Sequence, residues 1–360
     1  METTAEDTPS RTAKERHEKR IERLRDLVES GVVETARKKR KLLWQPDPKT
    51  EAVPWIAVRS ALFKITEDHP VRTRIQQVSS SKSAAVQVLL LALFELQVSP
   101  PRPKGWNTRL PIRYSDNPLI PSWVDFTALP TVDSTKTTTH ARIPRANRER
   151  QIKRALDRLA ASGRVELKPK GVHGRYENFG VLDEGTNQGP GNGTTYYAPP
   201  NLGTGKNRRL VVTIPVEFFL NGWIDALSDN EIITYLALRQ TAQAYPGRHD
   251  NEGIYLTQAK RTEDFNLDRG FEAHRMLARY GLINTIRDFR RSANGTMSGF
   301  EESGPGQIDR FTLNDSALAQ PAFSRVMKSL QQFANGFDSD LAGLTESIEL
   351  FTTAMADTQD

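Results

Sequence analysis

Apolar side chains at helical spacing form the clearest pattern in this chain. Four of them recur three and four positions apart, on one stripe of a helix that can be buried: Ile152, Ala155, Leu156 and Leu159. Gly163 follows, where a helix end favours a left-handed residue. Residues 164–168 and 175–182 then have strand-like composition and flank a turn at 169–174. The pattern predicts a helix, its C-terminal cap and a hairpin.

A second stretch repeats this pattern nearer the C-terminus. The spacing of Leu156, Leu159, Gly163 and Val165 is matched by a second set: His274, Leu277, Gly281 and Ile283. A strand to Phe289, a tip at 292–306 and a returning strand at 307–313 complete a second hairpin. We expect His274, at a core position, to be packed and hydrogen-bonded.

Another apolar helix precedes each of these units. Residues 83–98 form a broad apolar helix, and Ser228 with Glu231 gives the capping box of the other. The glycine- and proline-rich stretch between the units is typical of a linker. The chain therefore divides into a charged, partly helical N-terminal arm (1–50), a first domain (51–183), a linker (184–207), a second domain (208–314) and an acidic helical tail (315–360).

Positive charge is concentrated in the first unit. Residues 142–175 hold eleven Lys or Arg against three acids, a net +8 in a chain whose total is +6. The matching stretch of the second unit, 258–291, holds eight basic and five acidic residues. A basic helix of major-groove size beside a basic hairpin is typical of a duplex-DNA reader. The alternative is a solvated surface helix, the commonest role of a charge run.

Two short patterns carry a resemblance to a known architecture. They are Ile143-Pro144-Arg145 leading to Arg154-Ala155-Leu156 and Gly163, and Leu267-Asp268-Arg269 leading to Leu277 and Gly281-Leu282-Ile283. With their helices and hairpins they resemble tandem winged helix-turn-helix DNA-binding proteins, as in many plasmid replication initiators and some bacterial transcription regulators. The resemblance implies an α+β fold, mainly α, with two winged helix-turn-helix domains in tandem between the charged arm and a C-terminal helix. In initiators it also implies binding to repeated origin sequences, with one domain aiding dimerisation.

The start of the basic helix supplies the expected base contacts, since arginine pairs with guanine and asparagine or glutamine with adenine. These candidates are Asn147, Arg148, Arg150 and Gln151. Other basic residues of the helix and hairpin are expected at phosphates: Arg145, Lys153, Arg154, Arg158, Lys168, Lys170, His173 and Arg175.

The two ends of the chain have opposite charge. The arm contains the run Arg37-Lys38-Lys39-Arg40-Lys41, and we expect it to be flexible, either touching phosphates or solvated. The tail carries seven acids against two basic residues from Asp315 onward. Its apolar residues at 322–337 predict a helix that packs on the second hairpin or on another protomer. A homodimer through the second domain or this helix is therefore possible.

Several classes of protein are disfavoured by the composition. The chain has no cysteine, which excludes disulfides and cysteine-bound zinc, and its six histidines lack metal-ligand spacing. Gly203-Thr204-Gly205-Lys206 lacks the first glycine and the hydroxyl residue of a phosphate loop. The longest apolar run, 84–98, is too short to span a bilayer, and no secretion signal opens the chain. We expect no catalytic residues, metal, cofactor or membrane partner, and a cytoplasmic, nucleoid-associated location.

Three functional hypotheses follow. The first is a sequence-specific double-stranded DNA-binding protein, acting in transcription regulation or in replication and maintenance of a plasmid or mobile element. The second is a winged-helix scaffold for protein partners. It is favoured by the acidic tail and by the second recognition helix, at whose start Asp268 and Glu272 take the places of Arg150 and Arg154. The third is a nucleic-acid-processing enzyme, because scattered carboxylates that bind a metal leave no tight local pattern.

Overall fold

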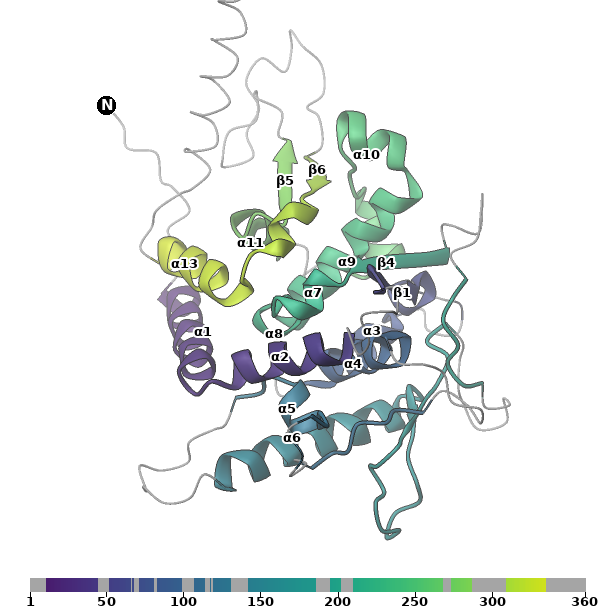
Figure 1. Cartoon of the computed structure of the whole chain (residues 1–360). Helices are drawn as coiled ribbons and strands as arrows, with labels where there is room; N and C mark the ends of the chain where they lie inside the picture. The colour runs from purple at the N-terminus through teal and green to yellow at the C-terminus, as the bar shows by residue number, and fades with distance from the viewer. Residues whose placement is uncertain are drawn as a thin grey trace, which may run out of the picture.

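The chain folds into a mainly helical structure with small antiparallel sheets (Figure 1). The computed structural model describes residues 11–44, 52–65, 67, 71–80, 83–98, 107–113, 117, 119–130, 142–185, 195–201, 210–267, 273–286 and 309–334. The expected tip at 292–306, the Gly203–Lys206 motif and the chain beyond residue 334 lie outside these ranges.

The N-terminal half contains most of the long helices. Its elements are α1 (Arg11–Glu29), α2 (Val32–Trp44), β1 (Trp55–Arg59), η1 (Ser60–Leu62), α3 (Arg74–Val78), α4 (Ala85–Val98), α5 (Trp123–Phe126), α6 (Arg142–Ala161), β2 (Val165–Glu166) and β3 (Gly180–Val181). The C-terminal half contains β4 (Val211–Pro215), α7 (Glu217–Leu220), α8 (Trp223–Ala226), α9 (Asp229–Ala244), α10 (Pro246–Glu252), η3 (Lys260–Asp264), α11 (Ala273–Arg279), β5 (Ile283–Ile286), β6 (Arg310–Leu313), η4 (Asp315–Ala319) and α13 (Ala322–Ala334).

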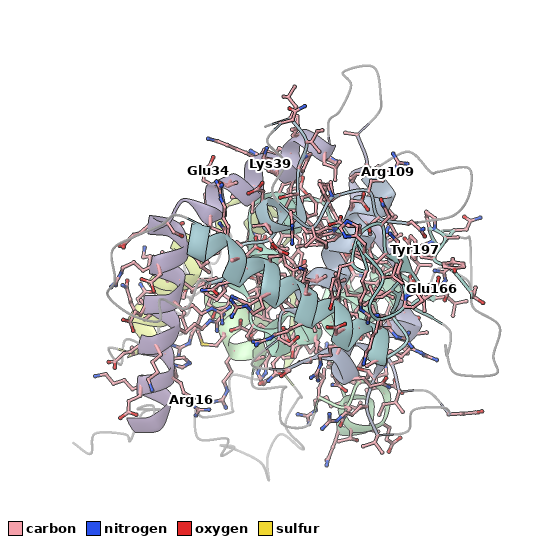
Figure 2. The ribbon with its side chains drawn as sticks, turned by 90° about the horizontal axis from the view of Figure 1, so that it is seen from below. Arg16, Glu34, Lys39, Arg109, Glu166 and Tyr197 are labelled. Carbon is pink, nitrogen blue, oxygen red and sulfur yellow. The ribbon has the colours of Figure 1, made fainter. Side chains whose placement is uncertain are left out.

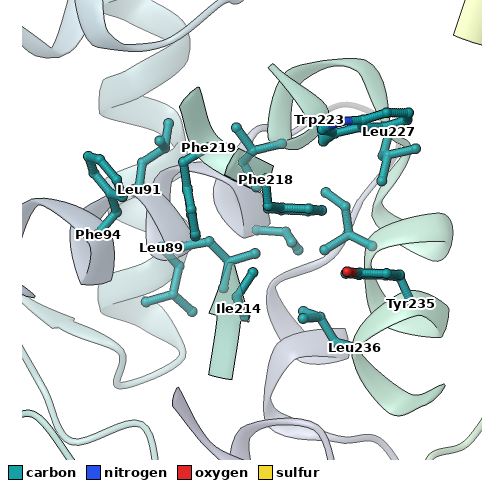
Figure 3. Close-up of a cluster of buried hydrophobic side chains, with 14 of the residues drawn as sticks. Leu89, Leu91, Phe94, Ile214, Phe218, Phe219, Trp223, Leu227, Tyr235 and Leu236 are labelled. Carbon is teal, nitrogen blue, oxygen red and sulfur yellow. The ribbon is translucent and has the colours of Figure 1, made fainter. Parts of the chain in front are cut away.

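Helix α4 lies at the centre of the hydrophobic core. It is apolar on all sides, and every residue in it except Gln97 is buried, as expected for a helix surrounded by other elements. Figure 3 shows Leu89 and Phe94 of α4 near Phe219 of α7, and the Phe94 and Phe219 ring centroids are 5.0 Å apart. The core is continuous from α1 to α13.

Strands β1 and β4 join the two halves. They pair antiparallel, with Ala57 opposite Thr213. Gln97, at the end of α4, donates to the carbonyl of Ala57 and accepts from its N–H, both at 2.8 Å. Gln243, at the end of α9, makes the same two bonds to Thr213, at 3.0 Å each. Each outer edge of this small sheet is thus closed by a glutamine amide, which blocks further strand pairing at that point.

The two units share one pattern of backbone hydrogen bonds. After α6, Gly163 has φ +67° and Arg164 N donates to Leu159 O; after α11, Gly281 has φ +75° and Leu282 N donates to Leu277 O. Each hairpin also pairs with one residue of a third segment through an isolated β-bridge. These bridges join Asn107 to Gly180 of β3 and Ile254 to Phe311 of β6. The spacing seen in the sequence therefore corresponds to a repeated local geometry.

Residues 11–44 of the N-terminal arm are part of the folded structure, which corrects our expectation that this segment is flexible. Helix α1 packs along α13 (Figure 1) and buries Ile21, Leu24 and Leu27. Arg20 of α1 donates to both carboxylate oxygens of Glu231 at the start of α9, at 2.8 and 2.6 Å. Helix α2 packs on α5 and α7. The arm therefore connects the two units.

The expected linker and tail also contribute to the core. Glu184 and Tyr197, both within the expected linker, are buried, while 186–194 and 202–209 lie outside the described ranges. The tail helix α13 buries Phe323, Val326 and Leu330 and packs on α1 and α8, rather than on β5 and β6. Its apolar face is covered within this chain.

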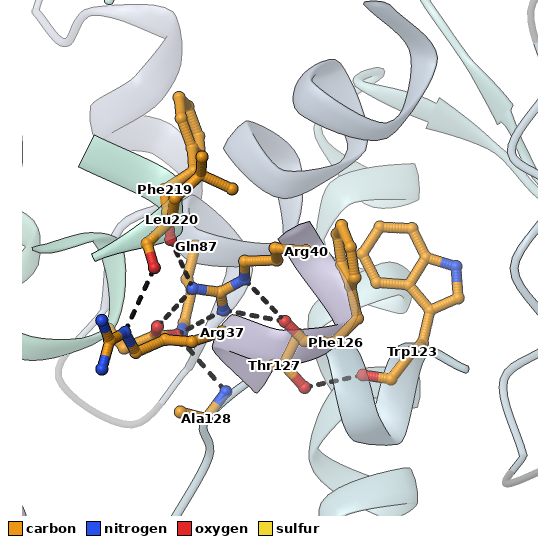
Figure 4. A network of polar contacts seen from close by, with 10 residues as sticks. Arg37, Arg40, Gln87, Trp123, Phe126, Thr127, Ala128, Phe219 and Leu220 are labelled. Carbon is orange, nitrogen blue, oxygen red and sulfur yellow. Dashed lines mark hydrogen bonds and ion pairs between the residues drawn. The ribbon is translucent and has the colours of Figure 1, made fainter. Parts of the chain in front are cut away.

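A buried ion pair lies where α2 meets the C-terminal half (Figure 4). Arg40 and Asp225 have fully buried side chains and form a double hydrogen bond, at 2.5 and 2.8 Å. The same guanidinium donates to the carbonyls of Phe126 in α5 and Phe219 in α7. Four elements therefore meet at one side chain.

Two further donors satisfy the Asp225 carboxylate. The amide of Gln87 in α4 donates to it, and so does the backbone N–H of Ala128, at 3.3 Å. A buried charge is tolerated only when it is paired and its remaining lone pairs are filled. The network meets both conditions.

We predict that Arg40→Met strongly destabilises the protein. The change leaves the Asp225 carboxylate buried without its cation, which costs about 3–5 kcal/mol. Lys41→Met, at the exposed neighbouring position, is the matched control and should change the free energy of unfolding by no more than about 0.5 kcal/mol. Urea denaturation measures both, and equal midpoints would contradict the prediction.

Candidate nucleic-acid interface

Helix α6 lies at one end of the molecule, with α5 and α4 on its inner side (Figure 1). Figure 2 views the molecule from this end, and α6 crosses the face nearest the viewer. The four apolar residues of the predicted stripe, Ile152, Ala155, Leu156 and Leu159, are fully buried. The opposite side of α6 therefore faces solvent.

Two arginines stand on this outer side. Arg150 and Arg154 are one helical turn apart and exposed, and neither has an ion-pair partner among the described residues. Ala146 and Ala161, also exposed, extend the same stripe.

The hairpin after α6 adds a second exposed basic group. Strands β2 and β3 pair through Val165 with Val181 and Glu166 with Gly180. The loop between them exposes Lys168, Lys170 and His173. This loop turns at Gly171 (φ +86°) and Gly174 (φ +65°), in a backbone region that other residues rarely adopt.

The hairpin loop is tied to α6 through one carboxylate. Asp157 accepts a hydrogen bond from Arg175 at 3.1 Å and another from the Tyr176 hydroxyl at 3.0 Å. The hydrogen bond to Asp157 raises the pKa of Arg175. Lys153 of α6 lies over the Tyr176 ring, 5.6 Å from its centroid. These contacts hold the C-terminal end of the loop against α6.

The other acid of α6, Glu149, is paired with cations. Lys153 contacts it at 2.5 Å and Arg113 at 3.3 Å. Partial burial would raise the pKa of Glu149, but the hydrogen bonds from Lys153 and Arg113 bring it below its usual value. Both acids on this side of α6 thus face basic partners.

Two of the four base-reading candidates direct their polar groups to backbone carbonyls of the protein. Arg148 is only 7% exposed, its guanidinium points to the Val124 carbonyl at 3.5 Å, and burial lowers its pKa. Gln151 donates to the Pro130 carbonyl at 2.6 Å. Among these candidates, Arg150 is exposed and Asn147 is half-buried.

Two phosphate candidates are engaged within the protein. Arg158 donates to the carbonyls of Gln77, Val78 and Ser79, at 2.7 to 3.2 Å, where α3 ends. Arg175 bonds Asp157 and also donates to the Lys168 carbonyl at 2.7 Å. Both were expected at phosphates, and the structure assigns their hydrogen bonds to the fold instead.

The remaining candidates keep some access to solvent. Arg145, Arg154, Lys168, Lys170 and His173 are exposed, and Lys153 is half-buried beside Glu149.

Arg113 also contributes to this face, although it was not among the predicted site residues. Its side chain is 76% exposed and reaches Glu149 from the loop before α5. This loop has no periodicity, so nothing in the sequence indicates that it lies against α6.

The matching face of the second unit is partly covered by the tail helix. Arg279 of α11 lies over the Phe333 ring, 4.3 Å from its centroid. Ser329 and Arg325 of α13 donate to the carbonyls of Arg279 and Tyr280. His274 packs against Phe311, with 5.3 Å between ring centroids. Asp268 and Glu272, expected at the start of this helix, lie outside the described residues.

Comparison of the chain with protein-family models, with curated proteins and with solved structures finds no match. In the described ranges no helix combines the length and apolar character needed to cross a bilayer. The same residues contain no group of three or more His, Asp or Glu placed to hold a metal ion.

We predict that two arginines of α6, one turn apart, differ in their effect on stability. Arg158→Ala removes three charge-assisted bonds to carbonyls at the end of α3, and should lower the free energy of unfolding by about 1.5–3 kcal/mol. Arg154→Ala, at an exposed site, should change it by no more than about 0.5 kcal/mol. Urea denaturation of both variants checks this, and equal losses would contradict it.

Proposed function

We propose that this chain is a sequence-specific duplex-DNA-binding protein with two winged-helix units, in which α6 enters the major groove and the β2–β3 loop lies along the phosphates. It acts in transcription regulation or in replication and maintenance of a plasmid or mobile element. The observation that carries the proposal is the exposed pair Arg150 and Arg154 on α6, beside an exposed basic loop anchored to the same helix.

The dimensions of α6 support this role. Its 20 residues extend roughly 30 Å, and a helix about 10–12 Å across fits a major groove about 12 Å wide. The stripe that carries Arg150 and Arg154 faces away from the core. These side chains can therefore reach base edges without breaking a contact within the protein. Arginine binds guanine O6 and N7 with two hydrogen bonds. We therefore assign the base contacts to Arg150 and Arg154, with Asn147 beside them.

The phosphate contacts are assigned to cations that keep access to solvent. These are Lys168 and Lys170 of the loop and Arg145 of α6, which are exposed, and Lys153 of α6, which is half-buried. His173 adds a hydrogen-bond donor in the loop. Such contacts fix the position of the protein on the duplex but carry no sequence information.

The C-terminal unit takes the weaker part in this proposal. Its helix α11 is short in the described chain, and α13 contacts its C-terminal end. Contact with the DNA backbone, or with a second copy of the protein, suits this unit better than base reading.

We predict that Arg150→Ala and Lys170→Ala weaken DNA binding in different ways. Loss of a base contact at Arg150 should cost about 1–3 kcal/mol on the preferred sequence and little on other sequences. Loss of a phosphate contact at Lys170 should weaken all sequences alike. Titration of labelled duplexes, chosen by selection from a random pool, measures both effects.

Arg25→Ala is the control for these variants. It removes the same charge from an exposed site on α1, the helix that packs along α13, and should leave affinity for every duplex unchanged. If Arg150→Ala and Lys170→Ala bind as the unaltered protein does, α6 and its hairpin are not the interface.

We also predict a steep salt dependence for the unaltered protein. Four lysine or arginine contacts to phosphates give a slope of roughly −3 to −4 in a plot of log affinity against log salt concentration. The same titration at several salt concentrations measures this slope. A flat plot would exclude phosphate contacts and favour a protein partner, and magnesium-dependent cleavage of plasmid DNA would favour a nuclease.

The genomic sites separate the two biological roles. Sequencing of DNA fragments that co-purify with the protein should give either single sites near promoters or repeated sites beside an origin. Repeats spaced by one helical turn indicate replication initiation.

A further inference from the structure

We propose that Asp157 is a positioning residue that holds the hairpin loop against α6, so that Lys168 and Lys170 meet the DNA backbone while α6 lies in the groove. This inference rests on the proposed function and assigns a role to an acid on the surface that would face DNA.

Asp157 links α6 to the hairpin loop through two hydrogen bonds, and we call this arrangement the clamp. One carboxylate oxygen accepts from Arg175 at 3.1 Å and the other from the Tyr176 hydroxyl at 3.0 Å. The same Arg175 guanidinium donates across the loop to the Lys168 carbonyl at 2.7 Å. Asp157 therefore reaches both the beginning and the end of the basic loop through one arginine.

The strand pairing alone gives the loop little support. Strands β2 and β3 pair through only two residues each. Within the loop, the backbone bonds are short-range turns, from Val172 N to Pro169 O and from Glu177 N to Gly174 O. A hairpin of this size is weak by itself. The contacts to Asp157 supply a longer-range restraint.

The charge of Asp157 and its proposed positioning role should have opposite effects on DNA affinity. Its side chain is 48% exposed, on the same outward side of α6 as Arg150 and Arg154. A carboxylate there repels phosphates, so its removal should strengthen binding if charge alone matters. If Asp157 positions the loop, its removal should weaken binding, because Lys168 and Lys170 lose their fixed places.

Glu149 provides a matched control. It is the other acid of α6, and it pairs with Lys153 and Arg113 rather than with the hairpin loop. Glu149→Gln removes one negative charge from the same helix and releases two cations. It should strengthen DNA binding through the charge effect.

The test compares Asp157→Asn with Glu149→Gln in duplex-DNA titrations over a range of salt. We expect Asp157→Asn to weaken binding by at least about threefold and to reduce the log–log salt slope by about one to two, since one or two phosphate contacts are lost. Glu149→Gln should tighten binding with no loss of slope. Tighter binding by both variants would overturn the proposal.

A second measurement does not depend on DNA. Trypsin cleaves after Lys170 when the loop is free, and Lys168 is protected by the following proline. Asp157→Asn should raise the rate of cleavage after Lys170 by several-fold over that of the unaltered protein, while Glu149→Gln should not. Equal rates in all three proteins would show that Asp157 does not restrain the loop.

The two measurements separate the two claims. If the unaltered protein binds no duplex but Asp157→Asn still speeds cleavage after Lys170, the proposed function is wrong and the clamp is structural only. If the unaltered protein binds DNA and Asp157→Asn neither weakens binding nor speeds cleavage, the positioning role is wrong while the proposed function stands.

Discussion

The rest of the structure depends on the buried ion pair between Arg40 and Asp225. Arg40 and Asp225 are 185 positions apart, and taking two charges into a core is costly unless their geometry is nearly ideal. The double hydrogen bond between them, with the carbonyl and amide partners around it, leaves few alternatives for how α2, α4, α5, α7 and α8 meet. An apolar contact of the same size would add cohesion but would restrict the relative positions of these helices much less.

The same constraint reaches the proposed DNA-binding face. Arg40 bonds the Phe126 carbonyl in α5, and α5 in turn packs against α6. The outward direction of Arg150 and Arg154 is therefore set by the core beneath α6, and the position of the basic loop is set by Asp157 above it. A recognition surface held by rigid elements on both sides keeps its geometry when a ligand binds.

Local patterns in the sequence predicted the helices and their caps, but not which charged side chains are exposed to solvent. The stripe from Ile152 to Leu159, the cap at Gly163 and its equivalent at Gly281 follow from spacing and from backbone sterics, and the structure contains all of them. Arg40 lies in a run of five basic residues, for which we expected either contact with phosphates or solvation. Its burial depends on Asp225, whose position only the tertiary structure defines. The same limit explains Arg148, Gln151 and Arg158, whose acceptors are backbone carbonyls of other segments.

Some arginines of residues 142–175 bond within the protein and others are exposed, and this difference affects how the net charge of +8 in this segment is interpreted. Arg148 and Arg158 direct their guanidinium groups to carbonyl oxygens rather than to carboxylates, so these hydrogen bonds do not neutralise their positive charges. They add to the positive field on the α6 side, whereas Arg150, Arg154, Lys168 and Lys170 are exposed and are the residues to which the proposed function assigns direct contacts. Long-range attraction governs how fast a polyanion arrives, and contacts govern how long it stays. Under the proposed function, Arg148 and Arg158 act on association, and sequence choice depends on the few arginines that remain exposed.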